Sequence, residues 1–197
     1  MKYHAAFQKM LKNEGGFRHT NIMNDLGGET YAGISRKNFP DWVGWEKIDK
    51  RVQRKFQLED DVKDFYLNEF WYKLGCDQIN DCSLRFLLFD IGINMGKKVV
   101  GKILQSALYR YSDEVGGLII DGIIGKKTIG VISSLHPETE TEIVFNDVRW
   151  AILNRYLDIC TGNPSQKKFL LGWARRISRH KITGDQAIPF RTKGGLS

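Results

Sequence analysis

Residues 83–95 constrain the fold more than any other stretch, because they are apolar on nearly every side. A helix that is hydrophobic all round has to be buried, so we expect this one, capped by Ser83, at the centre of the molecule. Past its first turn the polar residues are Asp90 and Asn94, whose i, i+4 spacing places them on one face. Buried polar groups need partners. The two side chains are therefore either a structural hydrogen-bonded pair or the polar lining of a substrate cleft.

Helical periodicity recurs along the chain and predicts a mainly α protein. Between the first two helices, residues 18–44 are rich in glycine and predict a long loop or a small β-hairpin, with short strands near 30–34. Loops of this length inside a small domain are more often functional than idle. Besides 83–95, the expected helices cover residues 3–14, 49–74 with a fresh start near 59, 98–112, 138–160 and 165–181.

At 197 residues the chain fits one domain or one domain with a closely packed extension. We expect residues 1–95 and 96–181 to form one globular unit, because the 83–95 helix is too apolar to be left half covered. Residues 182–197 carry a proline and paired glycines, and predict a loose tail. A monomer is expected.

The net charge of +7 is concentrated after Pro164, where eight lysines and arginines face one acid, so residues 1–163 are balanced. A balanced body argues against a broad nucleic-acid-binding surface, and no nucleic-acid partner is expected. The basic C-terminal part fits either adhesion to an anionic cell wall or a solvated face on a terminal helix. Its basic residues are Lys167, Lys168, Arg175, Arg176, Arg179, Lys181, Arg191 and Lys193.

No stretch approaches the ~20 continuous apolar residues of a transmembrane helix, and the N-terminus has no signal-peptide pattern. We therefore expect synthesis in the cytoplasm without a recognisable signal peptide, or a leader that has already been removed. The cysteines are odd in number and lack metal-ligand spacing, and no cysteine/histidine cluster is present. Neither a metal nor an organic cofactor is expected.

Glu14 stands at an unusual position for an acid. Gly15 and Gly16 should end the first helix directly after it, in the last turn, where the helix dipole is negative. That end favours cations by ~0.3–1 kcal/mol and disfavours an ionised carboxyl. A glycosidase's general acid has to be held protonated. The competing interpretation, a solvated glutamate at a helix end, is the commoner case for one glutamate considered alone.

The loop that follows Glu14 offers partners for such an acid. Asp25 is a candidate to stabilise an oxocarbenium ion, act as nucleophile or activate water, and Thr30 to position that water through its hydroxyl. Glu29 competes for the role of second carboxylate. An Asx-turn ahead of two glycines is the simpler explanation for Asp25 considered alone.

A series of short motifs runs in order along residues 3–180: EGGF (14–17), DLGG (25–28), TYAGIS (30–35), FW (70–71), FDIGINMG (89–96) and LQ (104–105). This series resembles the glycoside hydrolase family 108 N-acetylmuramidases, lysozyme-like enzymes found among phage endolysins and bacterial secretion-activator proteins. DGIIGKKT (121–128) is similar to the predicted peptidoglycan-binding segment that follows this catalytic domain, and GWARR (172–176) fits the family's end. Two positions depart from the family pattern: Leu26 replaces a common proline, and Phe17 a common tyrosine.

The resemblance implies a lysozyme-like helical fold, with residues 1–95 as the muramidase region and 96–181 as a peptidoglycan-binding-like segment. It implies hydrolysis of the β-1,4 bond between N-acetylmuramic acid and N-acetylglucosamine in peptidoglycan glycan strands, in the periplasmic or extracellular cell wall, with Glu14 as the catalytic acid. Phage lysozymes have a similar order of acid, aspartate and threonine, and this similarity implies catalytic roles for Asp25 and Thr30 as well.

Substrate-binding candidates come from the matching motifs. Trp71 belongs to an aromatic stripe that is usually core, although aromatic rings also stack on sugars. The alternative function is a non-catalytic cell-wall-binding or secretion-accessory module on a lysozyme scaffold. The full set of candidates is Tyr31, Trp71, Asp90, Asn94 and Gln105.

Overall fold

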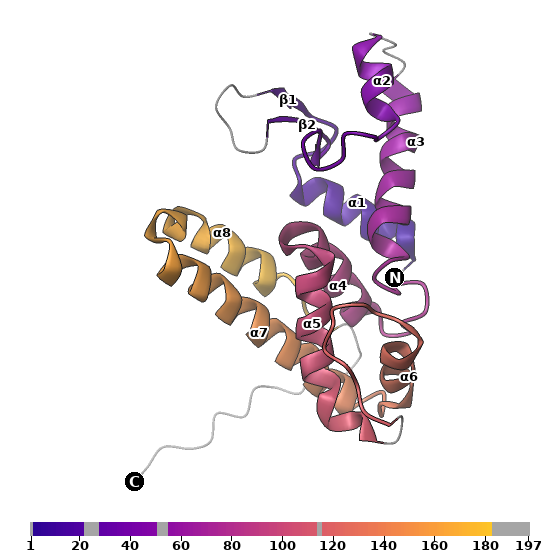
Figure 1. Ribbon diagram of the computed structural model, residues 1–197, viewed down its shortest axis with the longest axis vertical. Coiled ribbons are helices and arrows are strands. Elements are labelled where there is room, and N and C mark those ends of the chain that lie inside the picture. Colours follow the sequence, from indigo (N-terminus) through magenta and orange to yellow (C-terminus); the bar gives the residue numbers. More distant parts are fainter. Residues whose placement is uncertain (1, 22–27, 51–54, 114–115, 183–197) are drawn as a thin grey trace.

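The computed structural model describes residues 2–21, 28–50, 55–113 and 116–182, and these are mostly helical (Figure 1). Short 3-10 or π segments extend or connect several helices: η1 (Leu67–Trp71), η2 (Tyr109–Tyr111) and η4 (Pro164–Gln166). The α-helices are α1 (Tyr3–Asn13), α2 (Gly44–Asp49), α3 (Lys55–Tyr66), α4 (Cys82–Met95), α5 (Lys97–Leu108), α6 (Lys126–Ser134), α7 (Glu140–Gly162) and α8 (Lys167–Ser178).

Helix α4 lies at the centre, as its apolar sequence predicts. Leu87, Phe89 and Ile91 are fully buried, and α1, η1, α5 and α7 all pack against the helix. Its N-cap is Asp81 and not Ser83, because the Asp81 carboxylate accepts a 2.6 Å hydrogen bond from the Leu84 amide.

The glycine-rich region contains the expected small sheet. Strands β1 (His19–Asn21), β2 (Glu29–Tyr31) and β3 (Ile34–Ser35) are antiparallel in the order β1-β2-β3, with Thr20 opposite Thr30. Between β2 and β3, Ala32 and Gly33 both have positive φ. Such a pair is typical of the type I′ turn, whose twist matches that of the strands. Helix α2 also begins in this region and was not predicted.

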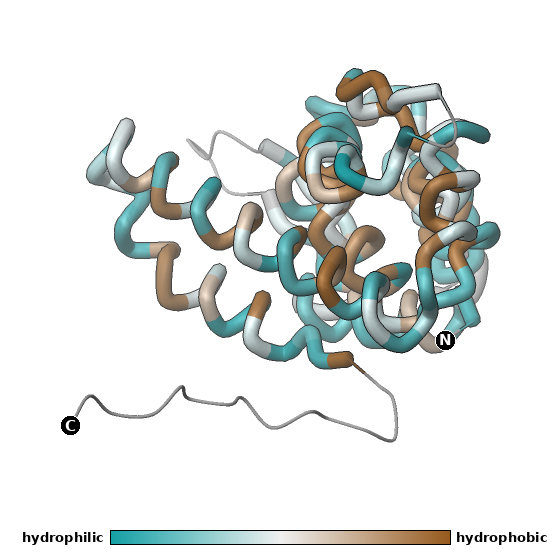
Figure 2. Tube along the Cα trace, turned by 90° about the horizontal axis from the view of Figure 1, so that it is seen from below, coloured by the Kyte–Doolittle hydropathy of each residue, from teal (hydrophilic) through white to brown (hydrophobic). Residues whose placement is uncertain are grey.

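Helices α7 and α8 form a hairpin that projects from the rest of the molecule (Figures 1 and 2). The C-terminal end of α8 returns toward α1 and α4, where Ile177 is buried. One continuous hydrophobic cluster therefore runs from Ala6 to Ile177 and includes residues of both 1–95 and 96–181. Within the described ranges, no helix is long and apolar enough to cross a membrane.

Candidate active site

Glu14 is the C-cap residue of α1, followed by Gly15 and Gly16 at positive φ. The Gly16 amide bonds the Leu11 carbonyl at 2.9 Å, and the Gly15 amide bonds the Lys12 carbonyl at 3.4 Å. These two bonds define a Schellman motif, which satisfies the last carbonyls of the helix and turns the chain sharply. The paired glycines thus fix the place at which the Glu14 side chain leaves α1.

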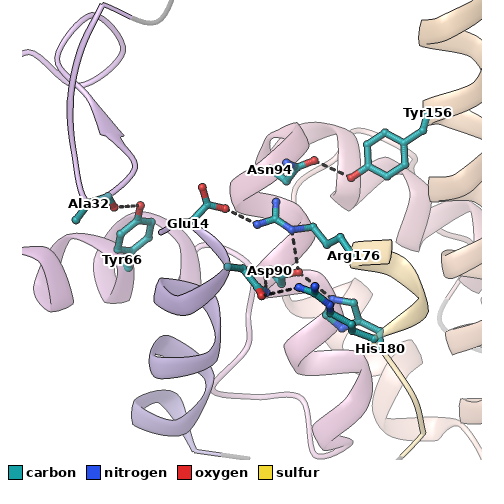
Figure 3. A network of polar contacts seen from close by, with 10 residues as sticks. Glu14, Ala32, Tyr66, Asp90, Asn94, Tyr156, Arg176 and His180 are labelled. Carbon is teal, nitrogen blue, oxygen red and sulfur yellow. Dashed lines mark hydrogen bonds and ion pairs between the residues drawn. The ribbon is translucent and has the colours of Figure 1, made fainter. Parts of the chain in front are cut away.

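The tip of the β2–β3 turn lies against Glu14. A Cβ added to Gly33 would lie 3.6 Å from both Cβ and Cγ of Glu14 and only 2.8 Å from the Tyr66 hydroxyl. That hydroxyl donates a 2.8 Å hydrogen bond to the Ala32 carbonyl (Figure 3). Tyr66 of α3 therefore holds the turn beside the acid, and burial raises the pKa of Tyr66 so that the hydroxyl keeps its proton.

Arg176 of α8 reaches the same carboxyl from the opposite end of the sequence. Its Nη2 lies 2.5 Å from Oε1 of Glu14, and its Nε lies 3.6 Å from Oδ2 of Asp90 (Figure 3). The guanidinium of Arg176 thus bridges the partly exposed carboxyl of Glu14 and the buried carboxyl of Asp90 on α4. The Glu14 side chain keeps 24% of its surface exposed, so a ligand can still reach it.

Asp90 anchors this network from the core, where it is fully buried. Its Oδ2 is 2.9 Å from Nε2 of His180, and its Oδ1 accepts a 3.3 Å hydrogen bond from the side-chain Nδ2 of Asn13. Burial by itself raises the pKa of Asp90, but the hydrogen bond to His180 and the charge of Arg176 outweigh burial and lower that pKa below its ordinary value. Asp90 is therefore a charged anchor for Arg176.

A hollow of about 400 Å³ opens beside Glu14. Its lining comes from the end of α1 and from α8, so residues more than 150 positions apart in the sequence share it. The lining residues are Asn13, Glu14, Lys168, Phe169, Gly172, Trp173, Arg176 and Arg179.

Residues 7–96 match the glycosyl hydrolase 108 family, and residues 100–178 match the family described as a predicted peptidoglycan domain. The chain carries a glycosyl hydrolase 108 domain. The glycosyl hydrolase 108 segment ends after α4, and the second matched segment includes α7 and α8.

The solved structure of SagA from Brucella abortus has a similar fold. It has 23% sequence identity to this chain and a TM-score of 0.64 over 90% of each chain. This match confirms the mainly helical fold, which the chain shares with SagA. A comparison with curated proteins gives no significant match.

Two candidate residues, Thr30 and Tyr31, lie on strand β2 of the glycosyl hydrolase 108 domain. The Thr30 hydroxyl is 2.6 Å from that of Thr20 on the neighbouring strand. Tyr31 is buried, and its ring stacks on Trp42 with centroids 6.0 Å apart, so its ring belongs to the core. Asp25 lies outside the described residues.

Glu29, the competing second carboxylate, is engaged within the sheet region. Its Oε1 is 2.8 Å from Nε2 of His19 and its Oε2 is 3.1 Å from Nε of Arg36. Both oxygens therefore have partners that tie β1, β2 and the end of β3 together.

The structure brings Asn94 to the C-terminal helices and places two other candidates, Trp71 and Gln105, among buried residues. The Tyr156 hydroxyl donates a 2.6 Å hydrogen bond to the side-chain Oδ1 of Asn94. Trp71 is buried, and the centroid of its ring lies 5.3 Å from that of Tyr3 and 5.4 Å from that of Phe89. It therefore packs in the core and presents no face to a sugar.

Gln105 is also structural in its contacts. It is 1% exposed, its amide nitrogen donates to Asp121 at 2.9 Å, and its oxygen accepts from the Gly122 amide at 2.7 Å. These bonds fasten the segment before α6 to α5. The sequence-based expectation of substrate contact by Gln105 finds no support in this environment.

Sequence reasoning missed Arg176 and His180 as site residues. In the sequence, Arg176 belongs to the GWARR motif and to the basic C-terminal part, and local spacing indicates no acidic partner for it. The available signal was their i, i+4 spacing within the helix expected over 165–181, although α8 itself ends at Ser178 and His180 follows it. Their shared partner Asp90 could be identified only from the tertiary structure.

No group of three or more potential metal ligands (His, Cys, Asp or Glu) occurs within residues 2–21, 28–50, 55–113 and 116–182. What the described residues place at the site is a partly exposed carboxyl, that of Glu14, next to the guanidinium of Arg176. Such a pair can deliver a proton and then stabilise the carboxylate that remains.

Proposed function

We propose that this glycosyl hydrolase cleaves the β-1,4 bond between N-acetylmuramic acid and N-acetylglucosamine, with Glu14 as general acid. The observation that carries the proposal is the position of Glu14. Within a glycosyl hydrolase 108 segment, it is a partly exposed carboxyl at a helix end, and it lines a hollow. The proposed substrate agrees with the predicted peptidoglycan domain that follows.

The Arg176 guanidinium pairs with the carboxyl group of Glu14. A general acid releases its proton as the bond breaks. Arg176 stabilises the carboxylate that forms when the proton moves to the glycosidic oxygen.

Cleavage leaves an oxocarbenium-like sugar that needs a second carboxylate or an activated water. We assign this role to Asp25, because both oxygens of Glu29 are occupied by His19 and Arg36. Thr30, on the strand that follows, is assigned to positioning the water. The substrate is the glycan strand of a periplasmic or extracellular cell wall, and the enzyme acts as a monomer.

The Glu14→Gln variant tests the assignment of the acid. We expect loss of at least ~10²-fold in the release of reducing ends from purified peptidoglycan, because removal of a general acid costs that much or more. The fold and Tm should remain nearly unchanged, since the side chain is partly exposed. Mass spectrometry of the released muropeptides would identify the bond that is cut.

Activity close to wild type in Glu14→Gln would refute the assignment. A wild-type protein that sediments with insoluble peptidoglycan but releases no reducing ends would instead support a non-catalytic wall-binding module. Asp25→Asn should cause a severe loss of reducing-end release, and Glu29→Gln a mild one. The reverse order would make Glu29 the second carboxylate.

A further inference from the structure

A second hollow of about 420 Å³ shares two lining residues, Phe169 and Trp173 of α8, with the hollow beside Glu14. Both hollows lie against this helix, and we call the two together the α8 groove. The far part of the groove is lined mainly by Asn94, Arg155, Tyr156, Gln166, Phe169 and Trp173.

The shared wall of the α8 groove is aromatic and held in place. Trp173 stacks on Tyr156 with centroids 4.7 Å apart and an interplanar angle of 14°, and Phe169 lies 5.9 Å from Trp173. The hydroxyl of Tyr156 is in turn bonded to Asn94 (Figure 3). Phe169 is 46% exposed. A fixed, partly exposed aromatic pair beside amide groups is a surface that suits the apolar face and acetamido groups of an amino sugar.

The α8 groove is also basic. Arg155, Lys168 and Arg179 line it together with Arg176, and Glu14 is the one acid among its described lining residues. Within the described chain, neither Arg155 nor Lys168 has a carboxylate partner, and Lys168 Nζ lies 5.0 Å from the centre of the Phe169 ring. Uncompensated cations beside a sugar platform favour a glycan that carries carboxylates.

We propose that the α8 groove is an extended substrate subsite for glycan strands with anionic stem peptides. Phe169 and Trp173 stack on a sugar ring away from the cleaved bond, and Arg155 and Lys168 pair with stem carboxylates. The proposal rests on the proposed function for the identity of the glycan. It makes the second segment of the chain a wall of the active-site cleft, in addition to any role in anchoring.

The stacking half of the proposal is tested by binding, in a Glu14→Gln background that prevents turnover. Isothermal titration would compare soluble glycan strands that carry stem peptides with the same strands after amidase treatment. Phe169→Ala should raise Kd about tenfold for both glycans, since loss of one stacked ring is worth about one factor of ten. The matched control is Trp150→Ala, an exposed aromatic on α7 that does not line the groove.

The charge half is tested with neighbouring lysines. Lys168→Glu should weaken binding of the stem-bearing strands about five- to tenfold and leave the stripped strands within about twofold, with a difference that shrinks as salt is raised. Lys167→Glu carries the same charge change one residue away, outside the groove lining, and should leave both affinities unchanged.

Each outcome decides the proposal. Three results would overturn it. The first is equal affinities for Phe169→Ala and Trp150→Ala, and the second is equal effects of the two lysine variants. The third is no binding of either glycan by the Glu14→Gln protein without a substitution in the groove. Because binding is measured without turnover, this failure is distinct from a failure of Glu14 as the acid, which is read from products. Circular dichroism of each variant checks that the helices are intact.

Discussion

At the scale of single residues, Glu14 is defined by contacts from three separate parts of the chain. The Schellman motif sets where its side chain leaves α1, Gly33 packs against its Cβ and Cγ, and Arg176 pairs with its carboxylate. Asp90 acts through Arg176, because it is fully buried and cannot meet a substrate. The acid is therefore positioned by neighbours that take no part in the bond cleavage.

Arg176→Ala should lower kcat about 10²-fold with a smaller change in KM. Displacement of a catalytic group by about 1 Å costs that much, and the variant also removes the charge that stabilises the carboxylate after proton transfer. Steady-state kinetics on soluble glycan strands would measure both constants. Arg175→Ala, an exposed neighbour on the same helix, is the control and should behave as wild type; equal kinetics for the two variants would contradict a positioning role.

Asp90→Asn should destabilise the protein by about 3 kcal/mol near neutral pH, because it removes one member of a buried charged network. The pKa of Asp90 is lowered on folding, so its contribution is present above its ordinary pKa and is lost as the pH falls through the lowered value. The difference between wild type and variant should therefore shrink below about pH 4. Urea unfolding across pH 2.5–7 would measure it, and a difference constant with pH would contradict a charged Asp90.

At the scale of elements, the site depends on one tight turn and one central helix. The type I′ turn between β2 and β3 brings Gly33 beside Glu14, and the hydroxyl of Tyr66 holds that turn. Helix α4 presents Asp90 and Asn94 one turn apart toward α8 and α7. A helix that is otherwise apolar thereby supplies two fixed polar points to the C-terminal hairpin.

Gly33→Ala should destabilise the protein by ~1–3 kcal/mol, because its φ of +81° is strained for a residue with a Cβ and that Cβ would lie 2.8 Å from the Tyr66 hydroxyl. Urea denaturation would measure the change. Gly130→Ala is the control, since Gly130 lies inside α6 with open space around it and the substitution should be neutral or stabilising. A neutral Gly33→Ala would show that the turn tolerates a side chain.

At the scale of the whole molecule, the α7–α8 hairpin links the two family segments. It projects outward and then returns the end of α8 to α1, so Arg176 and His180 meet Asp90. On the other side, α5 and α7 pack against α4. Catalytic segment and C-terminal segment thus share both a core and a polar network.

Residues 1–96 expressed alone should fail to fold cooperatively. Without α5 and α7, one side of α4 would be exposed, and large apolar patches of this kind cause aggregation. Thermal unfolding followed by near-ultraviolet circular dichroism should show no sharp transition, in contrast to the full chain. A sharp transition would mean that the first segment is an independent domain.

Much of the architecture could be predicted from local patterns. The apolar stretch 83–95 predicted a central helix, paired glycines predicted the end of α1 at Glu14, and the glycine-rich region predicted a small hairpin. These succeed because periodicity and turn chemistry act over a few residues. The burial of Trp71 and Gln105 could not be predicted, because a core aromatic and a buried amide have the same sequence appearance as groups that line a cleft.

The sequence by itself determined most of the helices, where α1 ends and which acid stands at that end. Only the tertiary structure decided that Arg176 would pair with Glu14 and that Asp90 and His180 would hold it. The reason is physical: a helix cap is set by neighbouring residues, whereas an ion pair between positions 14 and 176 depends on how α8 packs against α1 and α4. The environment of the acid is a property of the whole fold.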